Sequence, residues 1–216
     1  MTILAIGAHP DDVILSAGAW LSWHTDVVVA TVFAGDPDHD APLTAYDREA
    51  GFNTAGEAME ARREEDRNAC KIIGALPQHL PLLDGQYRGE HPYDHKLLVK
   101  VLLAIADELK PTLIVGPLGI VHSDHVAVGS AAWHAFKGRP ECQYVCAEDL
   151  PYRVDDPAAA VFEVAAKGLQ WFWPEQCPDD ERALQTKIAS LECYTSQLWA
   201  MPSFTYFVPE RFWLCP

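Results

Sequence analysis

Short runs of β-branched residues alternate with longer stretches of helical periodicity along the chain, and no other feature constrains its fold as tightly. This alternation is typical of βαβ units, in which helices cover both faces of a parallel sheet. The sequence therefore predicts an α/β fold with a mostly parallel sheet. We expect strands at residues 2–8, 26–34, 113–119, 143–147 and 161–164, and helices at 14–23, 57–73, 92–109, 124–136 and 179–197.

The composition narrows the class of protein. The 216 residues are 49% hydrophobic, and 31 Asp and Glu against 16 Lys and Arg give a net charge of −15. A surface this acidic is repelled by nucleic acid and by anionic membranes. No apolar run reaches the roughly 18 to 20 residues of a membrane span, and no basic, signal-like segment precedes the first strand. We expect a single domain, 1–216, in the cytoplasm, with residues 153–157 forming a loop.

Several familiar site patterns are absent from the sequence. The turn after the first strand lacks the G-x-G-x-x-G of dinucleotide sites, and neither a P-loop nor a G-x-S-x-G nucleophile elbow occurs. The six cysteines show no C-x-x-C spacing and no disulfide-scaffold density, so we expect reduced, mostly buried thiols. These residues are Cys70, Cys142, Cys146, Cys177, Cys193 and Cys215.

Two polar clusters each follow an apolar run. His9-Pro10-Asp11-Asp12 follows the first strand, and His122-Ser123-Asp124-His125 follows residues 113–119. Each cluster alone is more often a turn or a helix cap than a set of metal ligands. Two such clusters at the ends of neighbouring parallel strands favour a metal site instead. His9, Asp12 and His125 would supply three ligands and leave a position open for water, as in catalytic zinc sites.

The remaining residues of the two clusters suit proton transfer. Asp11 is expected to accept a proton from the bound water, and His122 with Asp124 resembles an acid with its orienting carboxylate. The other histidines are assigned to the surface or to loops. The cluster Asp36-Pro-Asp38-His39-Asp40 is interpreted as a solvated turn that borders the site at most.

These motifs resemble those of the PIG-L or LmbE-like deacetylases, zinc hydrolases that remove an acetyl group from N-acetylglucosamine-type amides. Ala8-His9-Pro10-Asp11-Asp12 is similar to the first family motif, and His122-Ser123-Asp124-His125 is similar to the second, H-x-D-H. Further similarities lie at Arg62-x-x-Glu65-x-x-x-Ala69-x-x-x-Ile73-Gly74, Lys187-x-x-Ala-x-x-x-Tyr194-x-Ser196-Gln197 and Glu210-Arg-Phe212. The resemblance therefore runs from residue 4 to residue 212.

The resemblance implies a Rossmann-like three-layer sandwich and a division of roles within the site. His9, Asp12 and His125 would hold Zn²⁺, with another divalent metal as an alternative. Asp11 would be the general base, and His122, held by Asp124, would stabilise the oxyanion or protonate the leaving amine. Arg62 or Arg63 is a candidate for binding a substrate oxygen or phosphate, with a salt bridge inside the run Arg-Arg-Glu-Glu-Asp as the alternative.

One position departs from the family pattern. Family members usually continue the first motif with Glu, where this chain has Val13. A carboxylate there would lie near the ligands or the substrate, and such groups change metal affinity or activity by about 10- to 100-fold. We still expect a competent hydrolase.

The substrate is expected to be a small N-acylated compound derived from an amino sugar. The alternatives are a zinc amidase for a non-sugar substrate, a non-catalytic metal- or ligand-binding relative, and a metal-free interaction protein. Residues 35–55, 85–92 and 152–178 are expected to select the substrate. Trp171, Phe172 and Trp173 are a candidate sugar platform, although core packing explains so apolar a run better. A homo-oligomer is left open.

Overall fold

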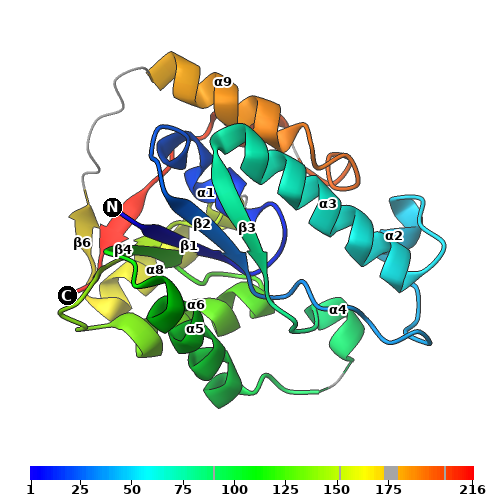
Figure 1. The fold of residues 1–216 in the computed structure, drawn as a ribbon, viewed down its shortest axis with the longest axis horizontal. Helices are drawn as coiled ribbons and strands as arrows, with labels where there is room; N and C mark the ends of the chain where they lie inside the picture. Colours follow the sequence, from blue (N-terminus) through cyan, green and yellow to red (C-terminus); the bar gives the residue numbers. More distant parts are fainter. Residues whose placement is uncertain (90, 151, 173–179, 202) are drawn as a thin grey trace.

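The strands form one mostly parallel sheet in the order β3-β2-β1-β4-β5-β7-β6 (Figure 1). The structure, a computed structural model, describes residues 1–89, 91–150, 152–172, 180–201 and 203–216. Among the strands of the described residues, only β6 and β7 run antiparallel to their neighbours. The strands are β1 (Ile3–Gly7), β2 (Val27–Thr31), β3 (Ala75–His79), β4 (Leu113–Pro117), β5 (Gln143–Ala147), β6 (Gln170–Phe172) and β7 (Phe212–Leu214).

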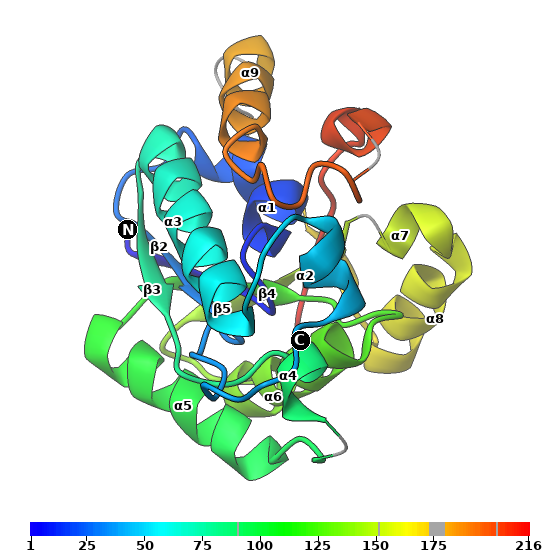
Figure 2. The same cartoon turned by 90° about the vertical axis from the view of Figure 1, so that its right-hand side faces the viewer.

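Helices cover both faces of the sheet, as Figures 1 and 2 show. α1, α3 and α9 lie on one face, and α5, α6 and α8 lie on the other. The helices are α1 (Asp12–Leu21), α2 (Ala45–Glu49), α3 (Ala55–Ile73), α4 (Gly85–Arg88), α5 (His95–Leu109), α6 (Ser123–Phe136), α7 (Tyr152–Asp155), α8 (Pro157–Lys167) and α9 (Asp180–Leu191), with a 3₁₀ turn at Ser203–Phe207. The predicted α/β class and three-layer arrangement are confirmed.

Strand β1 divides the core into two halves. Ile3 and Ala5 pack under α1 and α3, whereas Leu4 and Ile6 pack under α5 and α6. Successive side chains of a strand point to opposite faces, so a strand covered on both sides must be apolar throughout. All five residues of β1 are buried, which accounts for the uninterrupted apolar run in the sequence.

The order of the strands places the site. β1 pairs with β2 on one side and with β4 on the other, and the helices that follow β1 and β4 cover opposite faces. The chain therefore diverges at the carboxyl ends of these two strands. α/β proteins bind their ligands in the crevice at such a point.

Several expected elements differ in the structure. Residues 161–164 belong to helix α8, because Asp156 accepts hydrogen bonds from the Ala158 and Ala159 amides and Pro157 begins the helix. These helix signals outweigh the β-branched residues. The expected loop at 153–157 is instead the end of α7 and the start of α8. α9 ends at Leu191, shorter than predicted, and Asp179 lies outside the described residues.

The five described cysteines are free thiols, as predicted, and Cys177 lies outside the described residues. None of the helices in the described ranges is long and apolar enough to cross a membrane.

Candidate metal centre

The two polar clusters lie next to each other at the carboxyl ends of β1 and β4, where the following loops lead to opposite faces of the sheet. The backbone is strained at both loops, because Asp11 has a φ of 97° and Val121 a φ of 61°. Positive φ at residues other than Gly costs on the order of 1–3 kcal/mol each and gathers at functional sites. Gly119 and Gly129 allow the second loop to lie against α6, because a Cβ on Gly129 would sit 2.7 Å from the Gly119 Cα. The loop after β4 is thereby in close contact with α6.

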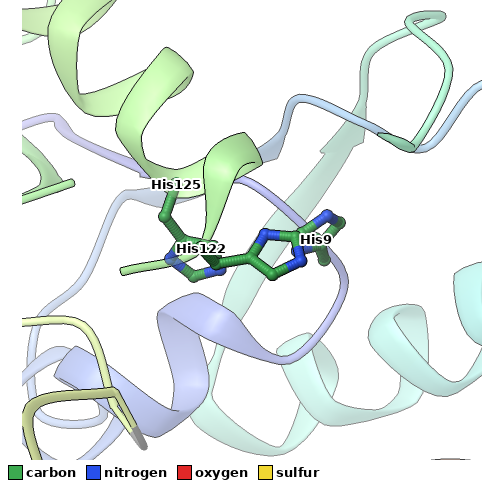
Figure 3. A group of neighbouring side chains, drawn as sticks. All are labelled: His9, His122 and His125. Atoms are coloured by element: carbon green, nitrogen blue, oxygen red, sulfur yellow. The ribbon is translucent and has the colours of Figure 1, made fainter. Parts of the chain in front are cut away.

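Three imidazoles converge in this crevice (Figure 3). The ring centroids of His9 and His122 lie 5.3 Å apart, those of His9 and His125 5.4 Å, and those of His122 and His125 5.6 Å. One ring nitrogen of each lies within 4.8 Å of the other two. The structure thus brings together the histidines that the sequence assigned to one site.

His125 presents an unpaired nitrogen to this crevice. Its side chain is 1% exposed, and its Nδ1–H donates to Asp149 Oδ1 at 2.7 Å. The other oxygen of Asp149 accepts the Gly119 amide at 2.8 Å. His125 Nε2 is buried without a hydrogen-bond partner and lies 3.2 Å from Asp12 Oδ2. A carboxylate on one imidazole nitrogen and a free lone pair on the other is the usual arrangement of a metal-binding histidine.

His9 is arranged in the same way. Its Nε2–H donates to Asp124 Oδ2 at 2.8 Å, which leaves Nδ1 facing Asp12 Oδ2 at 3.6 Å. Two ligand atoms placed tetrahedrally at about 2.1 Å from one zinc ion lie roughly 3.4 Å apart. The separations of 3.2 and 3.6 Å agree with that value. Asp12 thus lies within ligand spacing of both histidines, and nitrogen and oxygen donors of this kind are those that zinc takes. The described groups whose donor atoms all lie within 4.8 Å of one another are His9 with His122 and His125, and His9 with Asp84 and Asp124.

The pKa shifts show that the crevice holds excess negative charge. Burial and the neighbouring carboxylate of Asp12 raise the pKa of Asp11 well above its usual range. Burial alone would lower the pKa of His125, but Asp12 and Asp149 raise it to about 10. Without a bound cation, protons on Asp11 and His125 offset the neighbouring carboxylates. A divalent cation would supply the same compensation.

Asp124 differs from its predicted role. Its carboxylate contacts His9 and does not hold the ring of His122 among the described contacts; only its backbone N–H reaches His122 Nδ1, at 3.3 Å. The Arg88 guanidinium at 3.1 Å and the Gly85 amide at 3.0 Å fix the carboxylate, together with the Tyr93 hydroxyl. Asp124 is therefore placed to orient a metal ligand. The prediction from sequence assigned it to the wrong histidine.

His122 forms the wall of the crevice opposite these ligands. Its ring stacks on Tyr152, with centroids 5.7 Å apart. Burial, together with His9 and His125, lowers the pKa of His122 below its ordinary value. Since Nδ1 accepts the Asp124 amide, the neutral ring carries its proton on Nε2. His122 is thus a hydrogen-bond donor at neutral pH.

A cavity of about 830 Å³ opens over these groups. Arg62 lines it, with NH2 bound to the buried Asp47 Oδ1 at 2.6 Å and a buried Nε that has no partner. Arg63 lies outside the cavity lining and pairs with Asp36 and Glu60, both at 2.5 Å. Both arginines form salt bridges, but with acids outside the run 62–66, so the expected pairing inside that run is not found for either. Only Arg62 lines the cavity and stays a candidate for contact with the substrate.

Val13 lies away from the cavity. It is buried in the core with Ile14 and Leu15 and is not part of the cavity lining. The departure from the family motif therefore removes no group that faces the cavity in this structure.

Sequence reasoning missed several residues that shape the site, namely Tyr46, Asp84, Arg88, Tyr93, Asp149 and Tyr152. Asp149 could have been found from the sequence, because it is an acidic residue just after β5, the strand beside β4. The candidate platform at Trp171 is wrong: it lies on β6 against Trp213 and not in the cavity lining. Trp173 lies outside the described residues.

Comparison with known proteins identifies relatives of this chain. The PIG-L family model, described as GlcNAc-PI de-N-acetylase, matches residues 4–136. A triple mutant of a deacetylase of the teicoplanin biosynthetic pathway, Orf2*T, is 27% identical with a TM-score of 0.80, over 99% of this chain and 97% of that one. The zinc-inhibited form of teicoplanin deacetylase Orf2 is 25% identical, with a TM-score of 0.79 and the same coverage.

A third structure, Dbv21, a deacetylase of the A40926 pseudoaglycone, is 26% identical with a TM-score of 0.74, over 99% of this chain and 96% of that one. A search of curated proteins gives no match. The predicted family and fold class are confirmed, and these relatives agree with the predicted deacetylase activity. Since the family model covers well over half of the 216 residues, the chain belongs to the PIG-L family of de-N-acetylases.

Proposed function

We propose that this protein hydrolyses the N-acyl group of an amino-sugar derivative at a zinc centre held by His9, Asp12 and His125. One observation carries the proposal. The free nitrogens of the buried His125 ring and of the half-buried His9 ring flank Asp12 Oδ2 at 3.2 and 3.6 Å, while the opposite nitrogens are bound to Asp149 and Asp124. The description of the family and the activities of its structural relatives support the substrate class.

The residues around the centre divide the chemistry between them. A divalent ion, when bound, lowers the pKa of a water and polarises the amide carbonyl. Asp11 accepts the proton of the attacking water, a task suited to a carboxylate whose pKa is raised by burial. The water oxygen bonds to the acyl carbon as negative charge develops on the carbonyl oxygen. The Nε2–H of His122 donates to that oxygen.

The tetrahedral species then collapses. The C–N bond breaks, and the proton held by Asp11 passes to the leaving nitrogen. The products are a carboxylic acid and a free amine, so water is the only co-reactant. Arg62 is the candidate for contact with a substrate oxygen, because it lines the cavity.

The metal itself needs a direct test. Zinc is the proposed ion, although the related Orf2 has been described in a zinc-inhibited form. We expect activity to rise to one bound equivalent of zinc and to fall when excess zinc occupies further ligands. Protein stripped with a chelator should be reloaded with Zn²⁺, Mn²⁺ or Co²⁺ and assayed for amine release from N-acetylglucosamine derivatives.

Variants separate this function from its alternatives. His125→Ala should lose both metal and activity, whereas a zinc amidase for another substrate would hydrolyse non-sugar amides in preference to sugars. A non-catalytic metal-binding relative would bind one equivalent and release no amine. A metal-free protein would bind none, which would remove the proposal. The single domain, the homo-oligomer and the cytoplasmic location stay predictions.

A further inference from the structure

Two cysteines from distant parts of the chain place their sulfur atoms in contact. Cys146 lies in β5, and Cys215 directly follows β7, 69 residues further along the chain. Their Sγ atoms are 3.4 Å apart, and either thiol can donate the hydrogen bond between them. A disulfide bond is about 2.05 Å long, so the sulfurs need to approach by only about 1.4 Å to form one. We name these two residues the thiol pair.

The pairing of the strands produces this contact. β7, red in Figure 1, lies between β5 and β6 and runs antiparallel to both. Cys146 is opposite Trp213, and Cys215 lies on the same face of β7 as Trp213 because it is two residues further on. The thiol pair is therefore a diagonal pair across the two strands.

Formation of a bond requires a small movement of the backbone. Diagonal pairs have more widely spaced Cα atoms than directly opposite pairs, and disulfides favour close Cα atoms. Cys215 lies beyond Leu214, the last residue of β7, and its amide donates to the Tyr144 carbonyl at 3.0 Å. A shift at Cys215 therefore leaves the three paired residues of β7 in place.

The thiol pair differs in acidity from other described cysteines. Burial raises the pKa of three single thiols, those of Cys70, Cys142 and Cys193. The hydrogen bond with Cys215 instead lowers the pKa of Cys146, and the nearby Lys167 ammonium acts in the same direction. The thiolate is the reactive form of cysteine, and the shared proton allows either sulfur of the pair to carry the charge.

The two sulfurs also differ in their access to solvent. Cys146 is 0% exposed and packs in the core beneath α6, whereas Cys215 is half-buried. A small oxidant therefore reaches the pair at Cys215, and Cys146 lies directly behind it. An accessible thiol with a second cysteine beside it is the usual arrangement of a redox-sensitive site.

We propose that the thiol pair is a redox modification site, which hydrogen peroxide converts reversibly to a disulfide. The Cys215 thiolate attacks one peroxide oxygen, the O–O bond breaks, and Cys215 becomes a sulfenic acid. The displaced hydroxide takes up the proton that the thiol had lost and leaves as water. Cys146 then attacks the Cys215 sulfur, the S–O bond breaks, and its own proton leaves with the hydroxide as a second water. Two thiols are thus oxidised as one peroxide is reduced.

The disulfide would join the ends of a long segment that forms part of the cavity wall. Residues 147–214 contain α7, α8 and α9, and Tyr152, Asp155 and Gln197 of this segment line the cavity. A cross-link stabilises a protein mainly by restricting its unfolded chain, and the effect grows with the length of the closed loop. We expect oxidation to raise the melting temperature by about 10 °C. The proposal does not depend on the proposed hydrolysis, because thiols and unfolding are measured without substrate.

Thiol counting on the whole chain tests the site. Reduced protein, separated from its reductant, is treated with hydrogen peroxide, and its free thiols are titrated in denaturant. Wild type should lose two of its six thiols, and dithiothreitol should restore both. Peptide mapping under non-reducing conditions should show Cys146 joined to Cys215, and thermal unfolding should be compared before and after oxidation.

Matched variants assign the change to the thiol pair. Cys146→Ala and Cys215→Ala should each form no disulfide, and peroxide should not raise their melting temperatures. Cys142→Ala removes another half-buried thiol, close to the start of β5, and is the control. It should still lose two thiols on oxidation and gain the same stability as wild type.

The possible outcomes are distinct. If wild type keeps all its thiols at peroxide concentrations that oxidise free glutathione, the modification site is excluded. A disulfide that still forms in Cys215→Ala joins other cysteines and also overturns the proposal. A mapped bond between Cys146 and Cys215 without a rise in melting temperature supports the modification site and overturns its stabilising effect.

Discussion

Buried carboxylates occur in two regions of this molecule, and their surroundings differ. In the helical layer of α1, α3 and α9, Asp66 accepts hydrogen bonds from Tyr194, His79 and Thr31 at 2.7, 2.8 and 3.2 Å. Glu210 accepts from Lys187 Nζ and from the amides of Ala19 and Trp20 at 2.8–2.9 Å. At the carboxyl ends of β1 and β4, Asp12 faces a buried nitrogen of His125 that has no hydrogen-bond partner.

This difference separates side chains that stabilise the fold from side chains that are placed to bind a ligand. A buried polar atom without a partner costs about 1–3 kcal/mol. Trp20 and Trp23 Nε1 of the helical layer are also without a partner, so the His125 nitrogen indicates a ligand site only together with the Asp12 carboxylate that it faces. Positive φ at Asp11 and its raised pKa occur at the same place. Asp12 Oδ2 accepts the His9 amide at 2.7 Å, whereas Asp66 and Glu210 of the helical layer each accept three hydrogen bonds. We expect the two regions to respond oppositely to mutation.

The largest effect is expected for Asp11→Asn. It removes the proton acceptor while Asn tolerates positive φ, so the fold and the metal should be retained. We expect kcat to fall about 10³-fold, within the range of general acid–base catalysis. Amine release and bound zinc should be measured on the same preparation, and the melting temperature should stay close to that of wild type. Turnover near the wild-type rate would refute the role of Asp11.

Lys187→Met should show the converse behaviour. Lys187 is 1% exposed and pairs with Glu210, so its removal leaves a buried carboxylate without its cation. Breaking such a pair costs about 3–5 kcal/mol, or roughly 10 °C in melting temperature for a chain of this length. Thermal unfolding measures the loss, with the exposed Lys71→Met as control. Zinc content and kcat below the transition should be unchanged; a loss of zinc at full stability would erase the contrast between the regions.

The metal-free protein should lose stability as the pH rises. The folded pKa of His125 is raised to about 10 against an ordinary value of about 6.5, so its contribution is complete below pH 6.5 and is lost as the pH rises through 10. Zinc should remove this dependence, because the ion takes the place of the proton. Melting temperatures of chelated wild type and His125→Gln between pH 6 and 10 measure it. The same slope in both proteins would exclude His125 as its source.

The sequence predicted those strands that can be recognised from their own residues. β1, β2, β4 and β5 are buried on both faces and therefore appear as continuous apolar runs. β3 lies at the sheet edge, with Leu76 69% exposed and Pro77 within it, so it lacks any such run. The antiparallel strands β6 and β7 have three residues each, too few to show a period.

The candidate site divides in the same way. His9, Asp12 and His125 could be predicted because two motifs end neighbouring strands. The partners of these residues could not: Arg88 and Tyr93 reach Asp124 from 36 and 31 residues away, through a loop whose path the sequence does not reveal. Tyr194, Ser196, Lys187 and Glu210 stood out as family motifs, yet they bind Asp66, Glu65 and each other. Those motifs stabilise the fold, and only Gln197 among them reaches the cavity.

Arg88→Gln should give the smallest effect and the sharpest test of the boundary between the two regions. Arg88 binds Asp124, and Asp124 in turn orients His9. Arg88 would therefore act on a bound metal only through these two residues. We expect zinc affinity to fall about tenfold, as for other groups that support metal ligands, because Tyr93 and Gly85 still hold the carboxylate. Competition with a chromogenic chelator measures the affinity.

Arg139→Gln, which removes a surface ion pair with Glu141, is the matched control and should leave zinc affinity unchanged. If Arg88→Gln lowers the melting temperature and spares zinc affinity, Arg88 belongs with Lys187 and Glu210 among the groups that hold the fold. If zinc affinity falls at unchanged stability of the metal-free protein, the metal centre extends to Arg88 in α4. The two polar clusters at residues 9–12 and 122–125 would then describe only part of it.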